Sequence, residues 1–325
     1  FVSKPTFDPN LFVEGIDTEN WKALTESPDN PLLNRALRGT YPPGSTYKPF
    51  MAMAALQTGK RSADKVENDP GFYNFGGRTF RSHRGGLGGV DMHRAIQFSS
   101  NTYFYSLAAE MGVDLIHDFM APLGFGQFTG IDLQGESRGV LPSRAWKRAA
   151  YRRADMKTWH PGETISLGIG QGYNSFTMLQ LASANATLAN GGVRYQPHLV
   201  RAIRDTATGE VVRQVHPPAQ DLGYARKHVE VVRDAMVAVT KGGTGTRVFA
   251  GAAYTSAGKT GTSQAVGLSA KARASGKALE ARQRDHALYM AFAPAEDPTI
   301  AVAAIVENAG FGAAHAAPIV RRVFD

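Results

Sequence analysis

The hydrophobic pattern of this chain changes its periodicity between the middle of the sequence and the end. In the middle, apolar side chains recur at the spacing of a helix, and a glycine closely follows each run. These patterns predict helices that face a core over residues 45–57, 102–111, 176–188 and 228–239. A further helix is predicted over 314–324.

The carboxyl-terminal part has the pattern of strands instead. Apolar and β-forming residues make up 254–265, 286–293 and 299–307, and a Glu-Asp-Pro turn at 296–298 predicts that the last two are adjacent antiparallel strands. Helices in the middle and strands late in the sequence indicate an α+β fold, in which helices cover an antiparallel sheet.

Two further segments between these elements carry weaker signals. Residues 195–204 and 210–215 flank a Thr-Gly pair and predict a hairpin. The glycine- and arginine-rich residues 71–89 have too little periodicity for a long element and are predicted as loop with short turns.

Composition fits an ordinary globular protein. With 325 residues, 43% of them hydrophobic and 20% charged, the chain can bury a substantial core and has neither a disordered nor a fibrous bias. The absence of cysteine excludes disulfides and thiolate metal sites. No apolar run in the sequence approaches the roughly 18 to 20 residues that span a bilayer.

The net charge of +8 is mostly dispersed along the chain, which favours a basic surface over a dedicated binding patch. One basic cluster stands out, in the Ala/Ser/Gly-rich stretch 265–285 that is predicted as a mobile loop: Lys271, Arg273, Lys277, Arg282 and Arg284. This stretch lacks the interleaved aromatic residues of a single-strand-binding surface, so nucleic acid is not an expected partner.

The first candidate chemistry lies in residues 44–50, Gly-Ser-Thr-Tyr-Lys-Pro-Phe, at the start of an apolar helix. If Ser45 begins that helix, Lys48 at i+3 lies on the same face and can reach the serine oxygen. Gly44 allows the sharp turn that leads in. A second Ser-x-x-Lys at 62–65 lies in a polar stretch and is interpreted as a solvated turn.

The second candidate is the Ala-Gly-Lys-Thr-Gly-Thr run at 257–262. A phosphate-binding loop would need glycine where the chain has Ala253, and the flanks indicate a strand on both sides. On a strand, Lys259, Thr260 and Thr262 would instead suit a peptide that ends in a carboxylate. Gly261 would let the peptide backbone approach closely. A structural strand with an unrelated lysine is the alternative.

The third candidate is Ser99-Ser100-Asn101, which precedes the helix over 102–111. By itself this pattern is typical of a helix cap, and a similar Ser-Ala-Asn lies within the helix over 176–188. His83, Asp91 and His93 offer a possible ligand set, but their spacing matches no standard zinc site and no metal is predicted.

Taken in chain order, the motifs at 45–48, 99–101 and 259–261 match the three-motif signature of penicillin-binding proteins and serine β-lactamases. The runs at 38–45 and 161–173 sharpen the match. Over nearly its whole length, the chain resembles the transpeptidase domain of class B penicillin-binding proteins. It is most similar to the penicillin-binding protein 2 type of the rod-shape elongation machinery.

This resemblance implies a peptidoglycan D,D-transpeptidase on the periplasmic face of the bacterial inner membrane, with residues 1–325 as its transpeptidase domain. A membrane anchor and an amino-terminal pedestal domain are expected outside these residues. Some relatives bind a structural zinc through two Asp, a His and a Cys. Here Asp69 could match one ligand, but Ser100 occupies the position expected of the cysteine, so neither metal nor other cofactor is expected.

The resemblance also implies a role for each catalytic residue. Ser45 attacks the carbonyl between two D-alanines and becomes the acyl-enzyme, with Lys48 as the base. Lowering a lysine pKa from roughly 10.4 to about 7 costs some 4 to 5 kcal/mol, which burial and the charge of Lys259 could supply. Ser99 relays the proton to the leaving nitrogen, and Asn101 holds Lys48 and the substrate amide.

The remaining site residues are implied to bind the substrate. The carboxylate-binding wall consists of Lys259, Thr260, Gly261 and Thr262, and the backbone amides of Ser45 and Thr262 form the oxyanion hole. Implied partners are peptidoglycan stem peptides, β-lactam antibiotics and membrane proteins of the elongation machinery, namely a glycosyltransferase and a scaffold.

Two alternatives stay open. The same site could hydrolyse its acyl-enzyme, as a D,D-carboxypeptidase or a β-lactamase does, although no Glu-x-x-x-Asn deacylation motif lies near Glu163. A sensor or scaffold that binds β-lactams without turnover is the other alternative.

Overall fold

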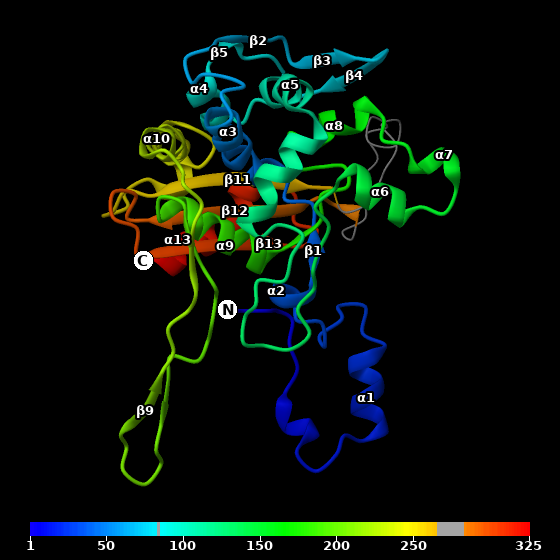
Figure 1. The fold of residues 1–325 in the computed structure, drawn as a ribbon. Coiled ribbons are helices and arrows are strands. Elements are labelled where there is room, and N and C mark those ends of the chain that lie inside the picture. Colours follow the sequence, from blue (N-terminus) through cyan, green and yellow to red (C-terminus); the bar gives the residue numbers. More distant parts are fainter. Residues whose placement is uncertain (83–84, 265–282) are drawn as a thin grey trace.

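A three-stranded antiparallel sheet lies at the centre of the molecule, in a computed structural model that describes residues 1–82, 85–264 and 283–325 (Figure 1). Its strands are β11 (Ala257–Ser263), β12 (His286–Ala293) and β13 (Ile300–Val306), in the order β11-β12-β13. Lys259 pairs with Met290, and Met290 pairs with Ala303. The predicted late strands and their antiparallel arrangement are confirmed.

The side chains of β12 alternate between two hydrophobic cores. Leu288 and Met290 belong to the larger core, whereas Ala287 and Tyr289 belong to the smaller one on the opposite face. Successive strand residues point to opposite faces of a sheet, so a continuous apolar run such as β12 must be covered on both sides.

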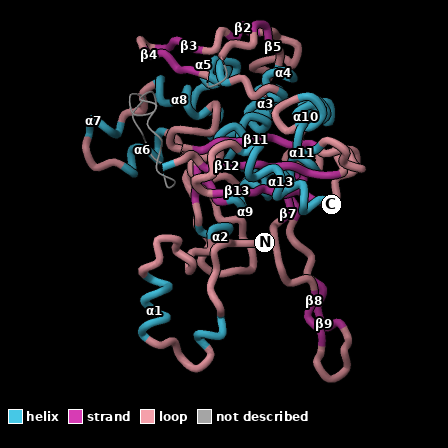
Figure 2. The backbone as a smooth tube through the Cα atoms, turned by 180° about the vertical axis from the view of Figure 1, so that it is seen from behind, coloured by secondary structure: helices cyan, strands magenta, loops and turns pink. Residues whose placement is uncertain are grey.

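Helices provide that cover, and Figures 1 and 2 show one group of them on the β11 side of the sheet. The larger core is built from α3 (Lys48–Gln57), α4 (Met92–Gln97), α5 (Asn101–Met120), α9 (Met178–Ala189) and α10 (Arg226–Gly242). The smaller core is closed by α11 (Thr246–Phe249) and α13 (Gly312–Phe324). The expected α+β fold with a helix-covered antiparallel sheet is therefore confirmed.

The other elements are short. The helical ones are η1 (Pro9–Phe12), α1 (Thr18–Thr25), α2 (Arg35–Arg38), η2 (Gly44–Tyr47), η3 (Ala121–Leu123), α6 (Arg144–Ala150), α7 (Ala154–Lys157) and α8 (Pro161–Leu167). The strands form two-stranded antiparallel pairs: β1 (Thr40–Tyr41) with β6 (Phe176–Thr177), β2 (Glu67–Asp69) with β5 (Gly88–Val90), β3 (Phe72–Phe75) with β4 (Arg78–Arg81), β7 (Val193–Tyr195) with β10 (Ala219–Asp221), and β8 (Ala202–Arg204) with β9 (Val211–Gln214).

The predicted helices are confirmed, with differences at their ends. The helix predicted over 102–111 continues as α5 to Met120, but its axis breaks at Gly112, which has a φ of 75°. Only glycine adopts such an angle without steric cost, and the predicted end of the helix coincides with this kink. The helix predicted from residue 45 begins with the 3-10 turn η2 before α3 continues it.

The prediction of loop over residues 71–89 was wrong. This region contains β3, β4 and β5, and the hairpin of β3 and β4 turns at Gly76 and Gly77, both in the left-handed region with φ values of 56° and 78°. Two consecutive positive φ angles suit a tight hairpin turn, and strands this short give too few residues for a periodic pattern to be recognised.

The predicted hairpin is confirmed only in its outer part. Strands β8 and β9 pair with each other and project away from the rest of the molecule (Figure 1). Tyr195, predicted in the same strand as Arg204, belongs instead to β7 and pairs with Ala219. Most of the basic stretch predicted as a mobile loop, 265–285, lies outside the described residues.

Candidate active site

Ser45 lies in η2, which continues directly into α3. Gly44 precedes it with a φ of 55°, and the backbone amide of Lys48 donates to the Ser45 carbonyl oxygen. In a 3-10 turn, residues i and i+3 lie one above the other. The structure therefore keeps the predicted spacing of the serine and the lysine, although the first turn is not α-helical.

Glycines allow η2 to lie directly against β11. A Cβ atom on Gly44 would lie 2.5 Å from the Thr262 carbonyl oxygen, and a Cβ atom on Gly261 would lie 2.9 Å from Cγ2 of Thr46. The sequence suggested that Gly261 makes room for a bound peptide. In the structure, the nearer reason is the close approach of the chain's own turn.

Lys48 is buried completely and points at the start of α5. Its Nζ donates to the Ser99 carbonyl oxygen at 2.8 Å, to the Ser99 hydroxyl at 3.1 Å and to Oδ1 of Asn101 at 2.7 Å. Two of these partners can only accept, whereas a hydroxyl can also donate. The arrangement thus suits a neutral amine, which has two hydrogens and one lone pair, as well as an ammonium.

The segment at 99–101 serves as a helix cap and also faces Lys48. Ser100, the middle residue, caps α5 by accepting from the Tyr103 amide at 3.1 Å. Ser99 has a left-handed φ of 61°, unusual for a residue other than glycine, and this turns Ser99 and Asn101 toward Lys48. Ser100 therefore forms the predicted cap, whereas Ser99 and Asn101 of the same motif contact Lys48.

Lys259 approaches the same hydroxyl from β11. Its side chain is also completely buried, and its Nζ donates to the Ser99 hydroxyl at 2.9 Å and to the Thr260 carbonyl oxygen at 3.1 Å. The Ser99 hydroxyl thus lies between the two amines, Lys48 and Lys259. The structure brings together the three motifs that the sequence placed about 50 and 160 residues apart.

Two residues that the sequence analysis missed complete the β11 side of the site. The hydroxyls of Thr244 and Thr260 lie 2.8 Å apart, and the side-chain amide of Gln171 donates to the Thr262 carbonyl oxygen at 3.1 Å. Both residues lie in glycine-rich runs, 242–246 and 168–172, between regular elements. Such runs were a usable signal, because loops that approach a site closely need glycine.

Tyr105 lies one helical turn after Asn101 and hydrogen-bonds its side chain. Burial raises the pKa of Tyr105 to about 12, although Arg78 and the bond to Asn101 act in the opposite direction. The phenol is therefore protonated at neutral pH. It can help to orient the Asn101 amide but cannot act there as a base.

The residues around the site do not fit a metal. Ser100 donates its hydroxyl proton to Oδ2 of Asp69 at 2.5 Å, so the residue at the expected cysteine position is engaged with the expected carboxylate ligand. Asp91 instead caps α4 by accepting from the Arg94 amide at 2.8 Å. Within the described residues, which exclude His83, no group of three ligand side chains comes together.

The second Ser-x-x-Lys and the second Ser-x-Asn of the sequence lie away from this site. Ser62 and Lys65 of the second Ser-x-x-Lys are exposed, and Lys65 pairs with Glu67 at 3.1 Å. Asn185 of the second Ser-x-Asn is buried and donates to the Ala291 carbonyl oxygen of the sheet. Their interpretation as structural residues agrees with these positions.

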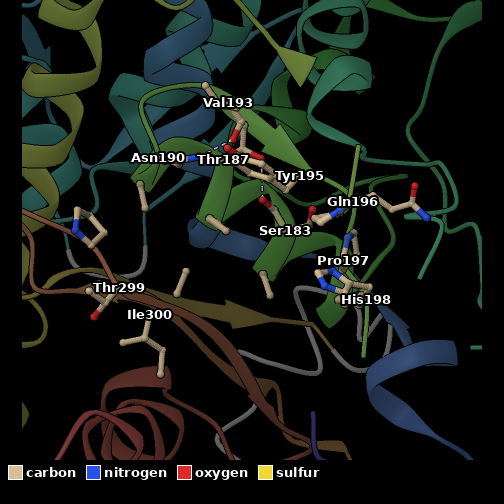
Figure 3. Close-up of a pocket in the computed structure, with 17 residues that line it drawn as sticks. Ser183, Thr187, Asn190, Val193, Tyr195, Gln196, Pro197, His198, Thr299 and Ile300 are labelled. Carbon is tan, nitrogen blue, oxygen red and sulfur yellow. Dashed lines mark hydrogen bonds between the residues drawn. The ribbon is translucent and has the colours of Figure 1, made fainter. Parts of the chain in front are cut away.

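A cavity of about 540 Å³ lies away from this site, between α9, β7 and the start of β13 (Figure 3). Tyr195, His198 and Ile300 are among the residues that line it, and none of the predicted site residues does. The predicted catalytic residues lie instead at the junction of η2, α5 and β11.

The whole chain, residues 1–325, matches the penicillin binding protein transpeptidase domain. The chain belongs to this family of transpeptidase domains. It is similar to the peptidoglycan D,D-transpeptidase MrdA of Acinetobacter baumannii, with 42% identity over 327 residues that cover 100% of this chain and 48% of the relative. The chain thus spans about half the length of the curated relatives it matches.

Solved structures of PBP2 proteins share the fold. A Pseudomonas aeruginosa PBP2 in complex with WCK 5153 superposes with a TM-score of 0.85 and 42% identity, over 100% of this chain and 67% of that one. PBP2 in a complex with MreC from Helicobacter pylori gives a TM-score of 0.84 and 28% identity, over 98% and 56% of the two chains. In the described part of the chain, no helix combines the length and hydrophobicity that crossing a membrane requires.

Proposed function

We propose that this chain is the catalytic domain of a peptidoglycan D,D-transpeptidase, which cross-links stem peptides through an acyl-enzyme on Ser45. The main support is the position of the Ser99 hydroxyl between the amines of Lys48 and Lys259. Lys48 itself lies one turn after Ser45. A connected set of hydroxyl and amine groups can move a proton from an attacking oxygen to a leaving nitrogen. Membership of the transpeptidase family supports the same reaction.

The reaction begins when the Ser45 hydroxyl attacks the carbonyl between the two D-alanines of a donor peptide. Lys48 accepts the serine proton, for which it must be neutral. Burial and the nearby Lys259 ammonium both disfavour its protonated form. A neutral Lys48 would give its two hydrogens to Asn101 and the Ser99 carbonyl and direct its lone pair toward the hydroxyl groups of the site, where it accepts the Ser45 proton.

The tetrahedral intermediate then collapses. Its oxyanion accepts hydrogen bonds from the amides of Ser45 and Thr262, where one lost donor would cost roughly 3 to 4 kcal/mol of transition-state stabilisation. Ser99 passes its proton to the leaving nitrogen and takes one from the Lys48 ammonium, the C–N bond breaks, and the terminal D-alanine departs. An amine of a second stem peptide then attacks the ester and gives a proton to neutral Lys48, the ester C–O bond breaks, and Lys48 returns that proton to the Ser45 oxygen.

The terminal carboxylate of the donor is bound by the edge of β11. Thr260 and Thr262 offer hydroxyls there, and the Thr244 hydroxyl that touches Thr260 extends the set. Lys259 is buried, so it acts on the carboxylate through its positive charge rather than as an exposed contact.

We further infer that residues 1–325 act as one transpeptidase domain at the periplasmic face of the inner membrane. The complete protein would then be held there by a segment outside these residues. A glycosyltransferase and a scaffold of the elongation machinery are the proposed protein partners. The complex of a similar PBP2 with MreC supports a protein partner of this kind of domain.

The assignment of Ser45 is tested with a fluorescent penicillin and intact-mass spectrometry. The expected product is a 1:1 adduct with the full mass of the penicillin, because opening a β-lactam ring releases no atom. Ser45→Ala should abolish it. Ser62→Ala, in the exposed second Ser-x-x-Lys, is the matched control and should react like the unchanged protein. No adduct on native protein, or an equal adduct on Ser45→Ala, refutes the assignment.

The three candidate activities differ in the step after acylation. A lipid-linked donor strand and an amine acceptor should give a cross-linked dimer if the protein is a transpeptidase. Release of D-alanine without the dimer would identify a carboxypeptidase. Stable acylation by the penicillin with no turnover of the peptide donor would identify a sensor or scaffold.

A further inference from the structure

Asp69 is connected to the candidate active site through Ser100, whose side chain does not face the site. Ser100 stands between Ser99 and Asn101, and its hydroxyl points away from Lys48 and donates to Oδ2 of Asp69 at 2.5 Å. The side chains of Ser100 and Asp69 are both about 1% exposed. The bond joins segments 31 residues apart, so it links the end of β2 to the start of α5.

Each oxygen of the Asp69 carboxylate and the hydroxyl of Ser100 has its own hydrogen-bond partner. Asp69 accepts from the Gly71 amide at 2.8 Å through its other oxygen, and Ser100 accepts from the Tyr103 amide at 3.1 Å. A hydroxyl has one proton to donate, and Ser100 donates this hydrogen bond to Asp69. A buried carboxylate that loses such a donor is costly, so the pair resists separation.

The backbone beside this pair is strained. Ser99 holds a left-handed φ of 61°, a conformation that residues other than glycine keep only where the surroundings enforce it. The amide of Ser99 donates to the Ile96 carbonyl at 3.2 Å and that of Ser100 to the Ala95 carbonyl at 2.9 Å. These bonds hold the segment from the α4 side, and Asp69 holds it from the β2 side.

We propose that Asp69 is a positioning residue for Ser99 and Asn101, and that it acts through the Ser100 hydroxyl. This inference rests on the function proposed above, because it concerns the geometry of that site. A direct hydrogen bond between two buried side chains forms the link.

Asp69 also ties this position to the pair of strands β2 and β5. Its backbone carbonyl accepts from the Leu87 amide at 2.9 Å, and Asp69 pairs with Gly88 in the β2–β5 ladder. A change in this strand pair would therefore be transmitted to Ser99 through the side chains of Asp69 and Ser100. Without the Asp69 carboxylate, Ser99 can relax from its strained backbone angle and move its hydroxyl out of line with the two lysines.

The proposal is tested by the rate of acylation with a fluorescent penicillin, separated into the binding constant and the acylation rate constant. Asp69→Ala and Ser100→Ala should each lower the acylation rate constant about tenfold or more and leave binding within about threefold, because misplacing catalytic groups slows chemistry. The double variant should be no slower than the slower single variant. Ser100→Thr keeps the hydroxyl and should restore most of the rate.

Loss of a helix cap alone is controlled with Ser143→Ala. Ser143 caps α6 by accepting from the Trp146 amide at 3.0 Å and makes none of the contacts described for Lys48, Ser99 or Asn101. This variant should keep the normal acylation rate, and thermal unfolding shows that each variant is folded. Added zinc or a chelator should not change the rates.

The outcomes separate this inference from the proposed function. If the unchanged protein forms no adduct on Ser45, the function fails. If it does react, but folded Asp69→Ala and Ser100→Ala react at the normal rate, only the positioning role fails. Independent, multiplicative effects of the two substitutions would also overturn it, because they would show that Asp69 does not act through Ser100.

Discussion

The side-chain amide of Gln171 donates to the backbone carbonyl oxygen of Thr262, at 3.1 Å. In an antiparallel strand, the N–H and C=O groups of one residue point to the same edge. Thr262 lies on β11, which has one neighbouring strand in the described sheet, and its carbonyl faces Gln171 and Gly44 rather than β12. Its amide therefore points to the same free edge, as an oxyanion-hole donor must.

We expect Gln171→Ala to slow acylation by roughly fivefold, because one lost hydrogen bond is worth about 1 kcal/mol and its loss lets the Thr262 peptide rotate. The melting temperature should change little. Gln196→Ala is the matched control, since Gln196 also donates to a backbone carbonyl, that of Gly130, on the exposed surface. Equal rates for the two variants would show that the Gln171 contact does not support the site.

Gly170 fixes the loop that carries Gln171 against the nucleophile turn. Its φ is 69°, its carbonyl accepts from the Gly44 amide at 2.9 Å, and an added Cβ would lie 2.2 Å from the Gly44 carbonyl oxygen. Gly170→Ala should lower the free energy of unfolding by about 3 kcal/mol or more, from backbone strain and overpacking together.

The backbone part of that loss is measured separately with Gly59→Ala. Gly59 has a similar φ of 66°, but an added Cβ would meet no atom within 4 Å. This control should cost only about 1 to 2 kcal/mol, the strain of the left-handed conformation. Urea unfolding of both variants checks the difference, and equal losses would mean that the contact with Gly44 relaxes without cost.

Local patterns in the sequence were sufficient to predict the elements that carry the site. The spacing of Ser45 and Lys48 depends only on one turn of helix, and the apolar run of β12 predicts a strand without reference to other segments. The link between Ser45, Asn101 and Lys259 required the order of three motifs, because each motif alone also fits a structural role.

What the sequence could not predict are the contacts that depend on tertiary packing. Gln171 contacts Thr262 across 91 residues, and Thr244 contacts Thr260 across 16 residues that include α11. The short strands within 71–89 have three or four residues each and are stabilised by their partners rather than by local preference. For Ser100, the sequence indicated a cap and the position of a zinc-ligand cysteine, but not the bond to Asp69, because that bond joins distant segments.

The ion pair of Lys147 and Glu163 should lose a different amount of stability when one or the other partner is removed. Lys147 donates to the two oxygens of Glu163 at 2.5 and 2.6 Å; the lysine side chain is 3% exposed, whereas that of Glu163 is 22% exposed. Removing the carboxylate leaves a buried cation without its counter-charge, whereas removing the amine leaves an anion that water can reach. Glu163→Gln should therefore destabilise by about 3 kcal/mol, and Lys147→Met by roughly half as much.

Urea unfolding of the two variants tests this order, with Arg153→Met as the control. Arg153 and Asp155 form a pair whose side chains are 75% and 63% exposed, so its loss should change stability by less than about 0.5 kcal/mol. A larger loss in Lys147→Met than in Glu163→Gln would contradict the argument from exposure.

A cluster at the end of the sheet should make stability depend on pH in two separate ranges. Burial lowers the pKa of His286 below its ordinary 6.5, although the carboxylates of Glu307 and Asp285 act in the opposite direction. Burial alone would raise the pKa of Glu307, but hydrogen bonds from Tyr41 and Arg35 outweigh it and bring the pKa below the ordinary 4.5. In both groups, the unfolded chain binds a proton more readily than the folded chain does.

The free energy of unfolding should therefore fall as the pH falls, because proton binding favours the unfolded chain. Protonation of His286 contributes to this loss below about pH 6.5, and protonation of Glu307 contributes below about pH 4.5. Thermal unfolding from about pH 7 to 3 checks this. His286→Gln can still accept from the Asn308 amide and should flatten the upper part of the profile, which begins at about pH 6.5 and extends downward. Glu307→Gln should flatten only the part below about 4.5. A His286→Gln profile as steep as that of the unchanged protein in the upper range would show that another group titrates there.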